Sequence, residues 1–187
     1  MCRLCGVKEE TVDHLVSCCS TIAQTDYKGR HDRVATLIHW SLCKQFGFPR
    51  ADNWWAHQAE KVLENEDFDF AIRTDKVIKE HRPDIVIVDK RSKQGLLVDV
   101  AIPGDARVAS KEIEKISKYQ DLAIEVQRLW ELRKVKVVPI VIGALGAVPV
   151  AFRKHLKSLN ISDISVEQLQ RTAILGTANI LRRYLSI

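Results

Sequence analysis

Residues 81–105 have the sequence HRPDIVIVDKRSKQGLLVDVAIPGD, and this stretch decides the fold. Two apolar runs, IVIV and LLVDVAI, flank a polar segment, which predicts a β-hairpin with its turn around residues 91–94. Antiparallel pairing about this turn places Val86 opposite Leu97. Because side chains alternate between the two faces of a strand, this register decides which residues share a face of the hairpin.

The same register places two aspartates, Asp84 and Asp99, directly opposite each other. Their Cβ atoms would lie about 5 Å apart, and like charges so placed repel. A divalent cation between them removes the repulsion, and Mg²⁺ binds through one or two carboxylates. Alternatively, each aspartate caps a turn or pairs with Arg82 or Lys90. For two aspartates within aliphatic strands, we favour a site for Mg²⁺ or Mn²⁺.

The segment after the hairpin supplies lysines. Helical periodicity over residues 108–134 places Lys111, Lys115 and Lys118 on one side. A lysine beside the aspartates could orient or deprotonate an attacking water, or offset charge at a phosphate. A solvated basic face is the alternative, and it suits Lys111 best.

The N-terminal sequence MCRLCGVKEETVDHLVSCC has the spacing of a metal site: Cys2-x2-Cys5-x8-His14-x4-Cys19. Three thiolates and one imidazole form a common structural zinc site. Cys18 is an alternative fourth ligand. Because four protein ligands leave no position for water, we expect this site to hold a small knuckle together and to contact nucleic acid rather than to catalyse.

Composition sets the remaining limits. The chain has 187 residues, of which 46% are hydrophobic, which suits one domain with a small appendage. Its net charge of +5 favours a polyanionic partner. No apolar run approaches the roughly 18 residues of a membrane span, and the N-terminus does not resemble a signal peptide. We therefore expect an intracellular protein in which clustered cysteines bind metal.

The pattern along the chain predicts an α/β protein. We expect a zinc knuckle over residues 1–20, a helical connector over 21–66 and a core over 67–187. Within these, the predicted elements are helices over 32–46, 54–65, 108–134, 148–159 and 165–185, strands over 68–74 and 136–146, and the hairpin. Pro139 predicts an edge position or a bulge. We expect packing or surface roles for three histidines and two tryptophans: His31, His39, His57, Trp54 and Trp55.

Together these motifs resemble the PD-(D/E)xK nuclease pattern. RPD at 82–84 is followed after fourteen residues by DVAIPGD from Asp99 and then by KISKYQDL from Lys115. More specifically, the chain resembles the restriction-like endonuclease at the C-terminus of non-LTR retrotransposon polyproteins. The cysteine knuckle, RHDRVA at 30–35 and VIGALGAV at 141–148 fit the same family.

The resemblance implies a restriction-endonuclease-like mixed sheet flanked by helices. It implies a nuclease that nicks target DNA to prime reverse transcription, with Asp84 and Asp99 as metal ligands. Ala101, not lysine, follows the second aspartate, so the catalytic lysine is expected on the following helix. Helix geometry favours Lys115 for this role, whereas the Lys-Tyr pair of that motif favours Lys118 beside Tyr119.

The resemblance also implies partners and a location. DNA is the expected partner and the RNA of the element a further candidate, in the nucleus and without a membrane. We expect the chain to be the tail of a longer reverse transcriptase polyprotein. Two alternatives remain at this point: a catalytically inactive remnant that binds nucleic acid, and an unrelated scaffold protein.

Overall fold

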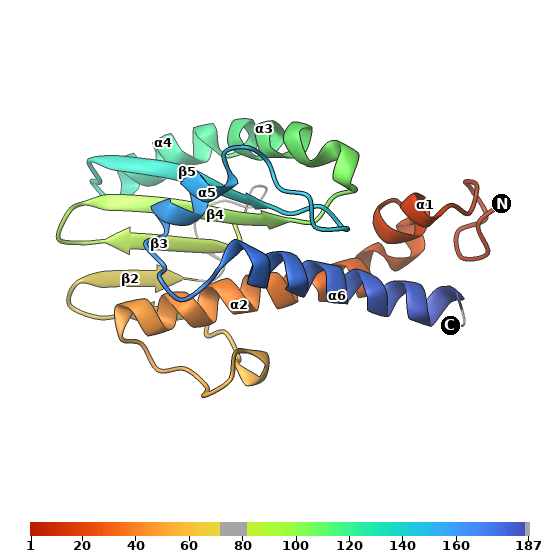
Figure 1. Cartoon of the computed structure of the whole chain (residues 1–187). Helices are drawn as coiled ribbons and strands as arrows, with labels where there is room; N and C mark the ends of the chain where they lie inside the picture. Colours follow the sequence, from red (N-terminus) through yellow and green to blue (C-terminus); the bar gives the residue numbers. More distant parts are fainter. Residues whose placement is uncertain (72–81, 186–187) are drawn as a thin grey trace.

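A single mixed β-sheet forms the centre of the protein. The computed structural model describes residues 1–71 and 82–185 (Figure 1). The strands lie in the order β1-β2-β3-β4-β5, antiparallel from β1 to β4 and parallel between β4 and β5. They span Val62–Glu64, Phe68–Ala71, Ile85–Asp89, Gln94–Ala101 and Lys134–Val141. The chain is therefore a mixed α/β protein, as its sequence predicts.

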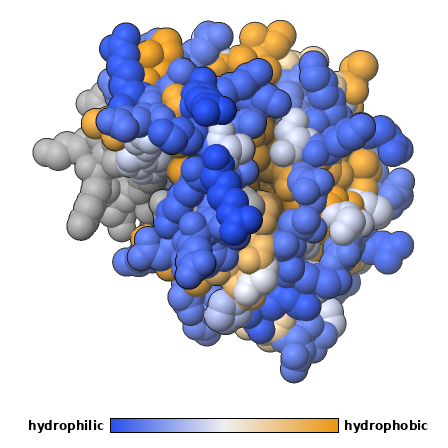
Figure 2. All heavy atoms as spheres, turned by 90° about the vertical axis from the view of Figure 1, so that its left-hand side faces the viewer, coloured by the Kyte–Doolittle hydropathy of each residue, from blue (hydrophilic) through white to orange (hydrophobic). Residues whose placement is uncertain are grey.

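The predicted hairpin is formed by β3 and β4. Val86 pairs with Leu97, which confirms the register, although the turn occupies residues 90–93 rather than 91–94. Lys93 has a φ of 52° in this turn. The turn lies at the end of the molecule away from both termini (Figure 1), and that end has a mostly hydrophilic surface with scattered apolar patches (Figure 2).

Helices cover both faces of the sheet (Figure 1). One face packs against α2, α5 and α6 through a large apolar core, and the other packs against α4 through a smaller one. The α-helices span Val12–Ser17 (α1), Lys28–Phe46 (α2), Val108–Lys118 (α3), Gln120–Leu129 (α4), Phe152–Ser158 (α5) and Val166–Leu185 (α6). Single turns of other helical types span Ser20–Ile22, Ala23–Tyr27, Trp54–Ala56 and Asp105–Arg107.

Strand alternation assigns the aspartates to one face of this sheet. Ile85 and Ile87 point into the larger core, whereas Val86 and Leu97 point toward α4. Asp99 has the parity of Leu97 and therefore lies on the helix α3 and α4 side. Because both faces of β3 and β4 are covered, most residues of these two strands are buried. A carboxylate in these strands is shielded from water and depends on neighbouring protein groups for its hydrogen bonds and counter-charges.

The predicted helix over residues 54–65 is wrong. Only Trp54–Ala56 forms a helical turn, and β1 at Val62–Glu64 pairs with β2 instead. Leu63 is buried between two exposed neighbours, which is the period of a strand. Sheet pairing here outweighs local helix propensity. Part of the segment expected to be a connector thus belongs to the central sheet. Of the predicted strand at 68–74, residues 72–74 lie outside the described residues.

The single helix predicted over residues 108–134 is two helices, α3 and α4, which meet at Tyr119. Tyr119 is buried, with φ −100° and ψ 6°, outside helical geometry. The edge position predicted from Pro139 is confirmed, since β5 is the last strand in the sheet order and Pro139 needs no partner for its missing N–H. At the start of α6, the Ser165 hydroxyl accepts a hydrogen bond from the Gln168 amide at 3.1 Å and so caps the helix.

None of the helices in residues 1–71 and 82–185 has both the length and the apolar character that crossing a membrane requires.

Candidate functional site

The two aspartates lie where β3 begins and β4 ends, at the end of the sheet that faces α1 (Figure 1). The β3–β4 ladder ends with the pair Ile85 and Val98, and Asp84 and Asp99 are the next residues outward. Both aspartates line one cleft, so the fold brings them to the same site as the register predicts. Burial, and after it the negative charge of Asp84, raise the pKa of Asp99.

Asp99 is 3% exposed and receives two contacts from the helix side of the sheet. The Lys115 ammonium lies 2.7 Å from Asp99 Oδ2, and the Tyr119 hydroxyl lies 2.5 Å from Oδ1. Burial and the charge of Asp84 raise the pKa of Asp99, and Lys115 and Tyr119 act in the opposite direction. Burial and the two carboxylates also raise the pKa of Tyr119, so its hydroxyl stays protonated and can donate.

Asp84 is held by the backbone and by a histidine. Its Oδ2 accepts a hydrogen bond from the Val100 amide at 2.7 Å and lies 3.1 Å from His31 Nε2. The other ring nitrogen of His31 lies 3.1 Å from an Asp32 carboxylate oxygen. Burial lowers the pKa of His31, but the two carboxylates outweigh it and raise the pKa to about 9. His31 is therefore a cation at neutral pH, fixed between Asp84 and Asp32.

His31 is the site residue that sequence reasoning missed, since a packing or surface role was expected for it. His31 contacts Asp84, which lies 53 positions later in the sequence, because α2 packs against β4 near the C-terminal end of that strand. The only signal in the sequence was its place in the RHDRVA motif at residues 30–35.

The lysines of α3 take different positions. Lys115 pairs with Asp99, whereas the Lys118 ammonium lies 3.4 Å from the Tyr119 hydroxyl and 4.9 Å from the centre of the Tyr119 ring. Lys111 pairs with Glu114 at 2.6 Å on the exposed side of the helix. Of the three, only Lys115 touches a carboxylate of the candidate site.

A cleft of about 630 Å³ opens over these residues. Its lining includes Asp84, Asp99 and His31, and it also includes five cationic side chains: Arg82, Arg107, Lys111, Lys115 and Lys118. A buried carboxylate, Asp99, and a partly exposed one, Asp84, in the lining of a basic cleft can together hold a hard cation beside a negatively charged ligand.

The N-terminal cysteines and histidine converge as the spacing predicts. One ligand atom each from Cys2, Cys5, His14 and Cys19 lies within 4.8 Å of all the others. The two sulfur atoms of Cys2 and Cys19 are 4.0 Å apart, and Cys5 Sγ is 3.4 Å from His14 Nε2. Tetrahedral zinc with sulfur at about 2.3 Å and nitrogen at about 2.05 Å requires separations of about 3.6–3.8 Å. The cluster could therefore hold a metal ion.

Two of these thiols have opposite pKa shifts. Backbone hydrogen bonds from Val7 and Lys8 lower the pKa of Cys5 to about 6, which favours the thiolate that a metal requires. Burial raises the pKa of Cys19, because an isolated thiolate there would be poorly solvated. A bound cation would compensate for that burial.

The structure distinguishes the two adjacent cysteines. Helix α1 ends at Ser17, and Cys19 has extended backbone geometry, with φ −74° and ψ 114°, which turns its side chain into the cluster. Cys18 instead lies 3.1 Å from a guanidinium nitrogen of Arg107. Cys19 is thus the fourth member of the cluster, and the Arg107 contact joins this N-terminal region to the wall of the basic cleft.

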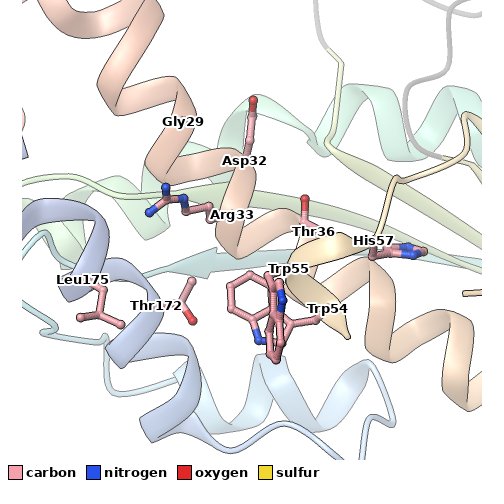
Figure 3. A pocket seen from close by; sticks show the side chains of 9 residues that line it. All are labelled: Gly29, Asp32, Arg33, Thr36, Trp54, Trp55, His57, Thr172 and Leu175. Atoms are coloured by element: carbon pink, nitrogen blue, oxygen red, sulfur yellow. The ribbon is translucent and has the colours of Figure 1, made fainter. Parts of the chain in front are cut away.

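A second hollow, of about 420 Å³, lies between α2, α6 and the turn at Trp54–Ala56 (Figure 3). Arg33 lies on its α2 wall, Leu175 on its α6 wall, and Trp54 and Trp55 meet edge to face at 6.1 Å between ring centroids. Trp55 is 70% exposed, so it does not pack in the core, and a role at the surface or at an interface stays a prediction.

No model of a known protein family matches the chain, and no curated protein matches its sequence.

Proposed function

We propose that the chain is a metal-dependent DNA endonuclease module of the restriction-like type, which nicks target DNA to prime reverse transcription. The observation that most supports this is the position of Asp84 and Asp99 at the base of a basic cleft, with Lys115 on Asp99. The mixed sheet flanked by helices is compatible with a restriction-endonuclease-like fold.

The donor atoms of this site suit a hard divalent cation. Carboxylate oxygens are the ligands of Mg²⁺ and Mn²⁺, and the electrostatic repulsion between Asp84 and Asp99 is relieved by positive charge. Such an ion would be held by Asp84 and Asp99, where it would activate water and stabilise negative charge on the phosphate.

The protein's own groups position this chemistry. The Val100 amide and His31 fix the Asp84 carboxylate, and Tyr119 fixes Asp99. Lys115 has its ammonium group at the site, where it can orient the nucleophile or offset charge at the scissile phosphate. Because these groups are already in place, little reorganisation is needed when DNA binds.

For the N-terminal cluster we propose a structural Zn²⁺ ion bound by Cys2, Cys5, His14 and Cys19. Three sulfur donors and one imidazole match the preference of zinc, and four protein ligands leave no open position. Leu15 and Ile22 pack beside the cluster against Ile180 of α6, so the ion would anchor this region to the core.

DNA is the partner that the basic cleft fits, because five arginine and lysine side chains line it and phosphate contacts dominate DNA affinity. A nuclear location and membership of a reverse transcriptase polyprotein follow from the proposed reaction, and the RNA of the element is a further candidate ligand. The Arg107 contact places the cysteine cluster beside the cleft, where the two regions could contact one DNA molecule.

The test is nicking of supercoiled plasmid DNA by the purified chain with Mg²⁺ or Mn²⁺. We expect nicked circles from the wild type and from Asp121→Asn, an exposed acid on α4 that serves as the matched control. We expect none from Asp84→Asn or Asp99→Asn, or when EDTA is present. Nicking by both site variants at the wild-type rate would refute the assignment.

The alternative function is a remnant that binds nucleic acid without cutting it. The observation in its favour is that Lys115 already neutralises Asp99, so a binding cleft needs no further cation. This alternative predicts salt-dependent DNA binding by the wild type and by Asp99→Asn alike, with no cleavage by either protein under any divalent metal.

A further inference from the structure

A second group of side chains that could hold a metal ion lies at α2, apart from the N-terminal cluster. His39 and Cys43 are one helical turn apart on α2, and His57 comes from the segment that follows Trp54–Ala56. One ligand atom from each of the three lies within 4.8 Å of the other two. His39 Nδ1 is 2.7 Å from His57 Nε2 and 3.6 Å from Cys43 Sγ.

The position of this group is unusual for polar side chains. His39 is 1% exposed and Cys43 is fully buried, and Cys43 belongs to the main apolar core. The rings of His39 and His57 stack at 4.9 Å between centroids with 24° between their planes. Figure 3 shows His57 with its ring turned away from the rings of Trp54 and Trp55.

The types of donor atom fit a metal site. Imidazole nitrogens and a cysteine sulfur are ligands that zinc prefers. The thiol of Cys43 lies within the main apolar core, and a bound metal ion would compensate for burying its thiolate there.

The donor atoms lie close to the spacing of a zinc site. Tetrahedral zinc requires nitrogen atoms about 3.3 Å apart and nitrogen and sulfur about 3.6 Å apart. Cys43 Sγ lies 3.6 Å from His39 Nδ1 but also 3.8 Å from His39 Nε2, so it lies beside the imidazole, and the His39 ring must turn before Nδ1 and the sulfur can share an ion. The nitrogens of His39 and His57 must separate by about 0.6 Å from their 2.7 Å contact. His57 lies on an irregular segment between a helical turn and β1, where so small a shift is inexpensive.

We propose that His39, Cys43 and His57 bind a second Zn²⁺ ion, with a water molecule as the fourth ligand. The ion ties the segment after α2 to the body of α2, next to the hollow lined by Trp54 and Trp55. Without a metal, a hydrogen bond between His39 Nδ1 and His57 Nε2 links the two histidines. This site does not depend on the proposed nuclease activity.

The test is the zinc content of the full chain, measured by plasma mass spectrometry after dialysis. We expect two ions per chain in the wild type. His57→Ala lowers the content to one, and His57→Cys, which replaces one zinc ligand by another, keeps it at two. His155→Ala is the control, because that histidine pairs with Glu112 elsewhere. Cys19→Ser removes only the N-terminal ion.

Cobalt substitution gives a second measurement. The N-terminal site offers three sulfur ligands and the proposed site one. The N-terminal site therefore gives the stronger charge-transfer absorption between sulfur and cobalt. We expect His57→Ala to remove the weaker contribution while circular dichroism stays that of the wild type. One zinc per chain in the wild type, or two in a folded His57→Ala protein, overturns the proposal.

Discussion

Lys115 forms an ion pair with Asp99, with 2.7 Å between Nζ and Oδ2, and both side chains are largely shielded from solvent. The pair joins α3 to the end of β4 and leaves Lys118 one turn further along, against the ring of Tyr119. Two lysines that the sequence could not rank thus have different environments. Of the two, Lys115 is the one whose ammonium contacts a candidate metal-binding carboxylate.

We predict that Lys115→Met lowers the rate of metal-dependent nicking by about 10²- to 10³-fold, the usual cost of removing one preorganised charge from a reacting centre. Lys118→Met changes the rate by less than about tenfold, because its ammonium contacts Tyr119 and not a carboxylate. The measurement is the single-turnover nicking rate with saturating Mg²⁺. Equal losses in the two variants would show that the ion pair with Asp99 does not select the catalytic lysine.

The hairpin illustrates what the sequence could predict about the site. The polar turn between two apolar runs defined the register, because antiparallel pairing about the turn sets which residues lie opposite each other, and a shift by one residue would move every side chain to the other face. That register brought Asp84 and Asp99 together without any knowledge of the other elements. The choice between Lys115 and Lys118 needed more, because it depends on how α3 is rotated and on the break at Tyr119.

His31 and the second metal-binding group show what the sequence could not predict. The contact of His31 with Asp84 requires α2 to pack beside the end of β4, and nothing local to either residue encodes that packing. Likewise, His57 approaches His39 and Cys43 only because the segment after Trp54–Ala56 folds back onto α2. Tertiary packing creates these sites, so a pattern along the chain gives little warning of them.

We predict that Cys19→Ser removes the zinc of the N-terminal cluster, whereas Cys18→Ser retains it. Cys19 is fully buried among the other ligands, and Cys18 lies beside Arg107. The measurement is the amount of zinc that a thiol-reactive mercurial releases from each variant, determined with a colorimetric chelator. The two cysteines are adjacent and the substitution is the same, so Cys18→Ser controls for the loss of a thiol. Equal zinc loss in both variants would contradict the assigned ligand.

A further prediction concerns the crossing of α2 and α6, which lie side by side in Figure 1. A Cβ added at Gly176 would lie 2.6 Å from Arg30 Cγ, closer than carbon atoms can approach. The Arg30 side chain cannot easily yield, because it is buried and bonded to the Thr177 hydroxyl at 2.7 Å and to the Ile102 carbonyl at 3.2 Å.

We therefore expect Gly176→Ala to lower the free energy of unfolding by about 1–2 kcal/mol, since overpacking costs about 1–3 kcal/mol and alanine returns up to about 1 kcal/mol of helix propensity. Gly29→Ala, on α2, is the matched control: nothing lies within 4 Å of its added Cβ, so the same substitution leaves stability unchanged or raises it slightly. Urea unfolding followed by circular dichroism measures both. A Gly176→Ala protein as stable as Gly29→Ala would mean that Arg30 moves freely.

The basic cleft supplies the last prediction, which concerns DNA binding apart from cleavage. Arg107 and Lys111 line the cleft but do not touch the aspartates, so their removal should weaken phosphate contacts and spare the reacting groups. Each phosphate contact contributes about 0.9 to the slope of log affinity against log salt concentration. We expect the Arg107→Ala, Lys111→Ala double variant to have a slope about 2 units shallower than the wild type.

The control is Lys154→Ala, Lys157→Ala, which removes the same charge from the exposed side of α5, away from the cleft lining. Fluorescence anisotropy with duplex DNA in EDTA, across a range of salt concentrations, gives the slopes. Equal slopes for the two double variants would place the DNA on another face of the protein.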